Sequence, residues 1–275
     1  MTRDITAVQT IQEVSALLAV PNSRILAGGT TLSQDTTDEL NLVDIKALEG
    51  LAGIKQKGTR IEIGPLTTLS EIAGSSLIKT CVPVLAEAAA NVGTAELREQ
   101  ATLGGNLAAS PAGDTAAALL ASGAKLTIKT DSDYRKILVD RFWDQDGKNG
   151  LQYDEWLTRI TVQFPKETVW GAAFGKYGEW GQSKSAATAV QLSLNEKNII
   201  TSIRGGLRLG THLIRRMFAM EKVLKNHPAV DENLEKAARA MLSAAGDVIN
   251  EESFTSFLLE LLQRALSQAK ERRTL

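Results

Sequence analysis

Two glycine clusters are the segments of this 275-residue sequence whose residue types best suit the binding of an anion. Glycine has no Cβ, so backbone N–H groups can approach anionic oxygens closely, and neighbouring hydroxyl and amide groups can add hydrogen bonds. This is the chemistry that a diphosphate requires, although a Gly-Gly pair taken alone can equally be a tight turn. The first cluster with its following residue is Ala27, Gly28, Gly29, Thr30, Thr31 and Leu32, and the second is Thr102, Leu103, Gly104, Gly105 and Asn106.

Other kinds of reactive site find little support in the sequence. Neither cluster is followed by Lys-Ser/Thr or fits G-x-G-x-x-G, which excludes a Walker loop and the dinucleotide fingerprint. Cys81 is the only cysteine, so a disulfide, a Cys-rich zinc site and a self-contained iron–sulfur cluster are excluded. The only histidines are His212 and His227, which we interpret as surface residues because a G-x-S-x-G elbow is absent. Redox or group-transfer chemistry would therefore need an organic cofactor.

The composition is that of a globular protein. Hydrophobic residues make up 43% and charged residues 23%, and the net charge is -1. A chain of this length can bury about 70 to 75% of its unfolded surface, as one large domain or two. The near-neutral charge argues against nucleic-acid binding, which depends on neutralising phosphates. The sequence contains no apolar stretch of the roughly 18 residues needed for a membrane span, and its first residues do not resemble a signal peptide, so we expect a cytoplasmic protein.

The elements around the clusters alternate between helix and strand. Apolar residues from Val8 to Leu18 recur at helical spacing, and an extended stretch at 24–26 leads into the first cluster. Strands are predicted at 42–45, 60–64 and 126–128, and helices at 84–91 and 116–121. Thr68 and Glu71 form a capping box, and Asp114 and Gly123 stand where the N-cap and C′ residues of a helix would be.

From about residue 167 the pattern changes. Strands at 187–194 and 199–204 are predicted to form a hairpin that continues into Gly205-Gly206. Two amphipathic helices follow, with apolar stripes beginning at Leu234 and at Phe257. Strands followed by helices favour an α+β domain.

Several motifs, taken in order, resemble one family. They are the two glycine clusters with Gly64-Pro65 between them, Arg98, Ser110-Pro111 with Gly113-Asp114, the segments 135–142 and 155–157, Phe174-Gly175-Lys176, and Gly205-Gly206. This set resembles the FAD-binding medium subunit of the molybdenum hydroxylases, which include xanthine dehydrogenases and aerobic carbon monoxide dehydrogenases. The implied fold is an α/β FAD-binding region of two small α/β subdomains over residues 1–166, followed by an α+β C-terminal domain with a small antiparallel sheet and helices over 167–275.

The resemblance also implies roles for individual residues. Both glycine clusters would hold the FAD diphosphate, and Asp114 would hydrogen-bond the polar chain of the cofactor. Leu157 and Lys176 would lie near the adenine or the flavin. The residues alone leave alternatives open, because Asp114 could be a plain helix N-cap and Lys176 a solvated lysine at a strand end.

In such an enzyme a molybdopterin on a large subunit oxidises the substrate. Two [2Fe-2S] clusters on a small subunit carry the electrons to FAD, which passes them to NAD or another acceptor. The single cysteine agrees with this division, because the clusters cannot be housed in this chain. Two alternatives are a self-contained FAD oxidoreductase and a degenerate scaffold subunit that has lost FAD. The scaffold alternative rests on residues 107–110, one fewer than the usual pattern; segments 33–39 and 177–181 also depart from it.

Overall fold

A computed structural model describes residues 2–32, 39–109, 112–130, 132–165, 169–178, 185–210, 213–245 and 251–273. Three departures from the family pattern therefore lie partly or mostly outside the described residues: the end of the short loop at 110–111, the polar segment 33–38 and residues 179–181. The histidine expected at the surface at position 212 also lies outside them.

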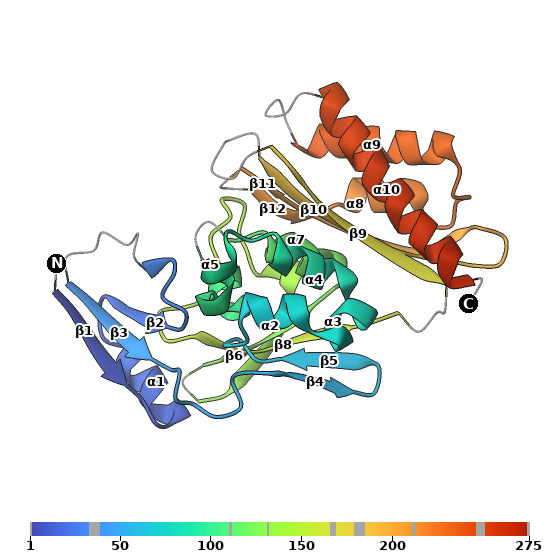
Figure 1. The fold of residues 1–275 in the computed structure, drawn as a ribbon. Coiled ribbons are helices and arrows are strands. Elements are labelled where there is room, and N and C mark those ends of the chain that lie inside the picture. The colour runs from blue at the N-terminus through green and yellow to red at the C-terminus, as the bar shows by residue number, and fades with distance from the viewer. Residues whose placement is uncertain are drawn as a thin grey trace.

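The N-terminal unit is a three-stranded parallel sheet with one helix, drawn in blue in Figure 1. Strands β1 (Thr2–Ala7), β3 (Glu39–Asp44) and β2 (Ser23–Leu26) lie in that order, and α1 (Ile11–Leu18) begins at the N-cap Thr10. The sequence predicts α1, β2 and β3 but misses β1. The reason is that β1 is an edge strand held by backbone pairing with β3, and its one large apolar residue, Ile5, is exposed.

The central unit is a five-stranded antiparallel sheet covered by helices on one face (Figure 1). Its strands, in the order β4-β5-β8-β6-β7, are β4 (Ile54–Lys57), β5 (Arg60–Ile63), β8 (Trp156–Gln163), β6 (Lys125–Lys129) and β7 (Tyr134–Leu138). The helices are α2 (Leu69–Gly74), α3 (Ser76–Cys81), α4 (Pro83–Ala90), α5 (Ala95–Gln100), α6 (Leu103–Ala108) and α7 (Thr115–Ala121). The predicted capping box of Thr68 and Glu71 is present at the start of α2, and Gly123 has the positive φ of +64° expected after α7.

The C-terminal unit is a four-stranded antiparallel sheet followed by helices. Its strands are β9 (Trp170–Tyr177), β10 (Ala186–Leu194), β11 (Ile200–Leu209) and β12 (Leu213–Arg216), and its helices are α8 (Phe218–Leu224), α9 (Asp231–Ala245) and α10 (Glu251–Arg273). The predicted hairpin is β10 with β11, and the stripes beginning at Leu234 and Phe257 belong to α9 and α10. The mixed α/β and α+β fold class is therefore confirmed.

Helices α4 and α7 join the central and C-terminal units. They lie between the two sheets, with α7 against β10 and β11 and α4 against β9 (Figure 1). The approach of α7 requires Gly206, because a Cβ there would lie 2.1 Å from the Ala117 carbonyl oxygen. This close packing brings the residue before α7 next to side chains of β9 and β11.

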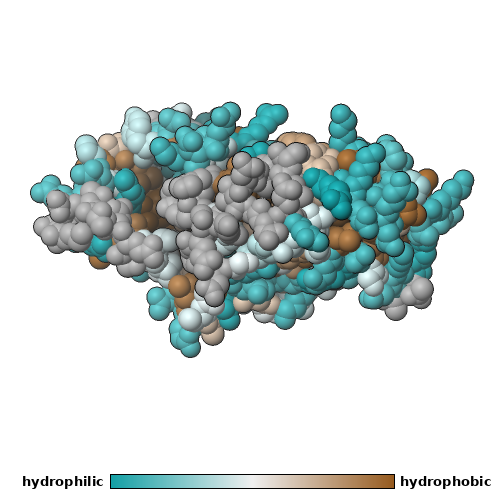
Figure 2. Space-filling view, turned by 90° about the horizontal axis from the view of Figure 1, so that it is seen from above, coloured by the Kyte–Doolittle hydropathy of each residue, from teal (hydrophilic) through white to brown (hydrophobic). Residues whose placement is uncertain are grey.

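The face of the molecule seen from above is mostly hydrophilic, with small separate apolar spots among the residues drawn in colour (Figure 2). Within the described residues no helix has the length and apolar character to cross a bilayer, and no group of three or more histidine, cysteine or acidic residues could hold a metal ion.

Candidate cofactor site

The first glycine cluster is a turn that leaves β2 and packs against the end of α5. Gly29 has φ +71°, a conformation that side chains other than glycine rarely adopt. A Cβ at Gly28 would lie 2.0 Å from the carbonyl oxygen of Gln100. The bare Cα of Gly28 thus allows the first cluster to touch the residues just before Thr102, where the second cluster begins.

The second cluster forms the first turn of α6 and packs against the Gly64-Pro65 motif. Thr102 is the N-cap of α6, and its hydroxyl accepts a hydrogen bond of 3.1 Å from the Gly105 N–H. A Cβ at Gly104 would lie 2.6 Å from the Pro65 Cβ, and the Gly104 N–H donates to the Pro65 carbonyl at 2.9 Å. Motifs that are far apart in the sequence therefore meet at one place, as the resemblance implies.

The backbone N–H groups of the second cluster are not open to a ligand, although the glycines of the sequence predicted that they would be. Leu103 N–H donates to the Thr67 carbonyl at 2.9 Å, and Asn106 N–H donates to the Thr102 carbonyl at 2.9 Å. With the bonds of Gly104 and Gly105 just described, the N–H groups from Leu103 to Asn106 all have acceptors within the protein. The glycines of this cluster therefore serve first to bring α6 close to its neighbours, leaving a backbone surface without side chains at Gly105.

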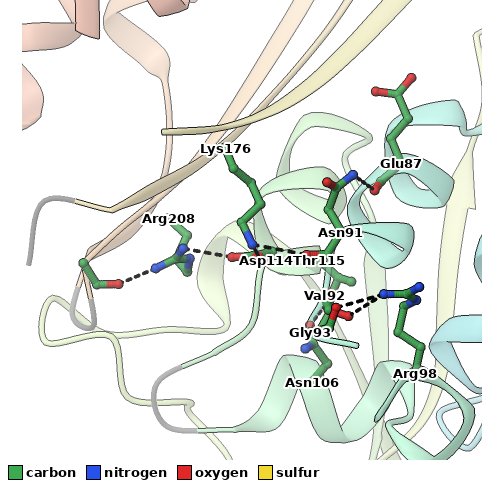
Figure 3. Close-up of polar contacts among 11 residues, drawn as sticks. Glu87, Asn91, Val92, Gly93, Arg98, Asn106, Asp114, Thr115, Lys176 and Arg208 are labelled. Atoms are coloured by element: carbon green, nitrogen blue, oxygen red, sulfur yellow. Dashed lines mark hydrogen bonds and ion pairs between the residues drawn. The ribbon is translucent and has the colours of Figure 1, made fainter. Parts of the chain in front are cut away.

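Asp114 is not the helix cap that its position before α7 suggests. Its side chain makes no capping hydrogen bond. Instead its two carboxylate oxygens pair with cations from two strands of the C-terminal sheet: Oδ2 lies 2.9 Å from Lys176 Nζ and Oδ1 lies 2.9 Å from the Arg208 guanidinium (Figure 3). The N-cap interpretation of Asp114 is wrong, and Lys176 is not a freely solvated lysine, since its Nζ also donates to the Asn91 carbonyl at 3.2 Å.

Arg208 is the site residue that sequence reasoning missed. Its side chain is 2% exposed, as is that of Asp114, and its guanidinium also donates to the Gly210 carbonyl. Burial lowers the pKa of Arg208, and the negative charge of Asp114 opposes that shift. The available signal was an arginine two residues after Gly205-Gly206, between the apolar residues Leu207 and Leu209.

The group formed by Asp114, Lys176 and Arg208, here called the charged triad, holds two cations and one carboxylate. Asp114 and Arg208 are almost fully buried, whereas Lys176 is 27% exposed. The ammonium group of Lys176 is therefore the cation of the triad that a ligand can reach, and it can donate hydrogen bonds to an anionic or hydroxyl oxygen.

Asn106 links the second cluster to the charged triad. Its side-chain oxygen accepts a hydrogen bond from the Thr115 hydroxyl (Figure 3). Its backbone carbonyl accepts a hydrogen bond of 2.8 Å from the Gly113 N–H. A Cβ at Gly113 would overlap the Asn106 amide. These contacts fold the segment after α6 back onto α6, which places Asp114 in the same region as the second cluster.

Two other residues of the resemblance have mainly structural contacts. Leu157 is buried in β8 opposite Ile128 and belongs to the core of the central sheet. Arg98 donates to the carbonyls of Val92 and Gly93 at 3.1 and 3.0 Å, which holds the turn before α5 (Figure 3). The contact of Leu157 with a cofactor stays a prediction.

The geometry fits an elongated ligand with an anionic centre. Gly28 and Gly29 give one backbone surface without side chains, Gly105 gives a second beside Thr102, and the charged triad adds positive charge nearby. FAD has this chemistry, because its diphosphate is anionic and its polyhydroxyl chain can exchange hydrogen bonds with carboxylate and ammonium groups.

Comparison with known proteins shows which family the chain belongs to. Residues 2–166 match the family model described as the FAD binding domain in molybdopterin dehydrogenase. The nicotinate dehydrogenase FAD-subunit of Eubacterium barkeri is 30% identical over 248 residues, covering 83% of this chain and 81% of the relative. The xanthine dehydrogenase FAD-binding subunit of Escherichia coli O157:H7 is 27% identical, covering 91% and 88% of the two chains.

A solved structure shows the same likeness over nearly the whole fold. A chain of reconstituted CO dehydrogenase from Oligotropha carboxidovorans superposes with a TM-score of 0.86 at 25% identity, covering 99% of each chain. The chain belongs to the family of FAD-binding subunits of the molybdenum hydroxylase type of dehydrogenase.

Proposed function

We propose that this chain binds FAD at its two glycine clusters and passes electrons from [2Fe-2S] clusters of a partner subunit through FAD to an acceptor such as NAD. The observation that carries the proposal is the meeting of the two clusters: Gly28 lies against Gln100, two residues before Thr102, the N-cap of α6. Bound FAD would supply the ability to accept electrons one at a time and deliver a pair to a two-electron acceptor.

The residues of this chain would hold and orient the cofactor rather than react with it. The glycine clusters would hold the diphosphate against backbone that carries no side chains, and Thr102 would lie beside the second cluster's glycines. Asp114 and Lys176 would exchange hydrogen bonds with the polar chain or the flavin. The positive charge of the charged triad favours anionic groups of the cofactor.

The partners follow from what the chain lacks. Cys81 alone cannot ligate an iron–sulfur cluster, which needs about four thiolates or their equivalents. Electrons from a molybdenum site would therefore have to arrive through a cluster on another chain. We assign the molybdopterin to a large subunit and the [2Fe-2S] clusters to a small subunit of a heteromeric complex.

Turnover by the isolated chain and by the complex tests this function. The purified chain loaded with FAD should be inert toward hydroxylase substrates such as purines or aldehydes. Co-expression with matching large and small subunits should restore turnover coupled to reduction of NAD or an artificial acceptor. Full substrate oxidation by the isolated chain would contradict the proposal and favour a self-contained flavoenzyme. A chain that assembles but never binds FAD would favour the scaffold alternative.

A further inference from the structure

The central sheet has one face away from its helices, and this face is strongly basic. Every strand of the sheet contributes lysine or arginine to this face, and the pairings of Lys55 with Glu62 and of Lys57 with Arg60 show how they lie side by side on β4 and β5. Residues paired across antiparallel strands point to the same side of the sheet. We call this surface the basic face; its cations are Lys55, Lys57, Arg60, Lys125, Lys136 and Arg159.

The inner and outer faces separate cleanly along β5 and the second half of β8; at the start of β8 the outer face is covered, because Trp156 is buried in the cluster of the N-terminal unit. Ile61 and Ile63 of β5 are fully buried under the helices, whereas Arg60 and Glu62 alternate with them on the basic face. In β8, Ile160 and Val162 are buried and Arg159 is on the basic face. The basic side chains therefore come from all five strands of the sheet and not from one loop.

The cations of the basic face are exposed and outnumber its acids. The side chains of Lys57, Arg60 and Arg159 are 53, 56 and 49% exposed. Glu62 is the only carboxylate among the described strand residues of this face. The whole protein has a net charge of -1, so positive charge is concentrated here and not spread over the molecule.

Glu62 organises part of the basic face. Its carboxylate lies 2.9 Å from Lys57, 3.5 Å from Arg60 and 3.6 Å from Arg159. The hydrogen bond from Lys57 and the nearby arginines lower the pKa of Glu62, so it stays ionised at neutral pH. Three cations are held around one anion, which reduces the entropy that they would lose on binding a partner.

A hollow in the basic face gives a partner a place to insert side chains. Its volume is about 380 Å³, and Lys57, Thr59, Arg60, Lys125, Thr161 and Gln163 line it. Cationic, hydroxyl and amide donors there match the acceptors of aspartate and glutamate side chains.

We propose that the basic face docks an acidic surface of another subunit of the hydroxylase complex. This inference rests on the proposed function for the existence of that complex. A protein surface fits better than a nucleic acid, because the chain as a whole has a net charge of -1 and gives no long-range attraction to a phosphate backbone. A small anion would contact only the hollow and leave the rest of the face unexplained.

Charge reversal tests the docking. The double variant Lys57→Glu/Lys125→Glu should bind the purified subcomplex of large and small subunits about tenfold more weakly than the wild type. Its binding should also lose much of the salt dependence that the wild type shows from about 50 to about 300 mM NaCl. Lys236→Glu/Arg239→Glu on the exposed side of α9 makes the same change in net charge and should bind like the wild type. Lys57→Gln/Lys125→Gln should lie between the wild type and the glutamate variant.

The outcomes separate this inference from the proposed function. FAD content and thermal unfolding of each variant, measured first, should match the wild type because the basic face lies apart from the glycine clusters. Unchanged affinity of the glutamate variant, or an equal loss in the α9 control, would overturn the docking site while leaving FAD binding and complex formation intact. Binding of a single-stranded DNA oligonucleotide that depends on Lys57 and Lys125, with subunit association unaffected, would assign the face to nucleic acid and also overturn it. A wild-type chain that never associates with the subcomplex would overturn both proposals.

Discussion

Replacing Asp114 by asparagine should destabilise the FAD-free chain far more than the loss of a helix cap would. Asparagine keeps the shape of the side chain but removes its charge, which leaves the Arg208 guanidinium buried beside a neutral group. Removing one partner of a buried ion pair costs about 3 to 5 kcal/mol, whereas losing an N-cap costs about 0.5 to 2 kcal/mol. Lys176 is 27% exposed and can turn toward water, so we assign most of the cost to Arg208.

Urea unfolding of the FAD-free protein, followed by circular dichroism, gives the measurement. The FAD-free form is needed because a bound ligand adds its own stabilisation to the folded state. The corresponding loss in Tm should be on the order of 10 °C. Asp44→Asn is a matched control, because Asp44 pairs with the exposed Lys46 and its ion pair should contribute less than about 1 kcal/mol.

A double-mutant cycle identifies the cause of the loss. Arg208→Met removes the buried cation, so Asp114→Asn should cost much less in the Arg208→Met background than in the wild type. The expected coupling energy is about 2 to 3 kcal/mol. A cost for Asp114→Asn below about 1 kcal/mol, or additive effects of the two substitutions, would refute the account of the charged triad.

Three further substitutions test other parts of the structure. Gly28→Val should abolish FAD binding, because its Cβ would meet the Gln100 carbonyl and separate the glycine clusters; retention of FAD by the folded variant would contradict this. Glu155→Gln should lower stability at pH 7 by about 2 kcal/mol. Hydrogen bonds from Arg135 lower the pKa of Glu155 below its usual value, so the ionised Glu155 stabilises the folded state near neutral pH. This stabilisation is lost as the pH falls through the pKa of Glu155 in the folded state. A difference in stability between Glu155→Gln and the wild type that persists in acid would contradict this assignment. Glu87→Gln should have the opposite effect on stability. Burial raises the pKa of Glu87, so its ionisation destabilises the folded state at pH 7, and the variant should unfold at a higher urea concentration than the wild type at pH 7 but not below about pH 4. A variant less stable than the wild type at pH 7 would contradict this assignment.

Local signals in the sequence predicted much of the fold. The capping box at Thr68 and the glycine after α7 are determined by residues within one helical turn, and both were found as expected. Strand β1 was missed because its stabilisation comes from backbone pairing with β3, which leaves no apolar alternation in the sequence. The confirmed elements are those whose own side chains define a buried face.

The charged triad could not be predicted because it depends on tertiary contacts. Asp114 has the residue type and position of an N-cap, and only the packing of α7 on β11 brings Arg208 within reach of its carboxylate. The hydrogen bonds of the second glycine cluster depend in the same way on Pro65 and Thr67, which are distant in sequence. Local propensity describes what a residue can do, and the fold selects which partner it finds.

The FAD content of the purified chain tests the central claim most directly. After refolding with excess FAD and removal of free cofactor, the flavin absorbance should correspond to close to one FAD per chain. Gly105→Val should bind none while keeping the wild-type circular dichroism spectrum, because its Cβ would stand at the edge of α6 and 3.0 Å from the Thr102 hydroxyl. Gly74→Val, where the added Cβ has no neighbour within 4 Å, should bind FAD like the wild type. A colourless wild-type protein, or full FAD content in Gly105→Val, would contradict the account.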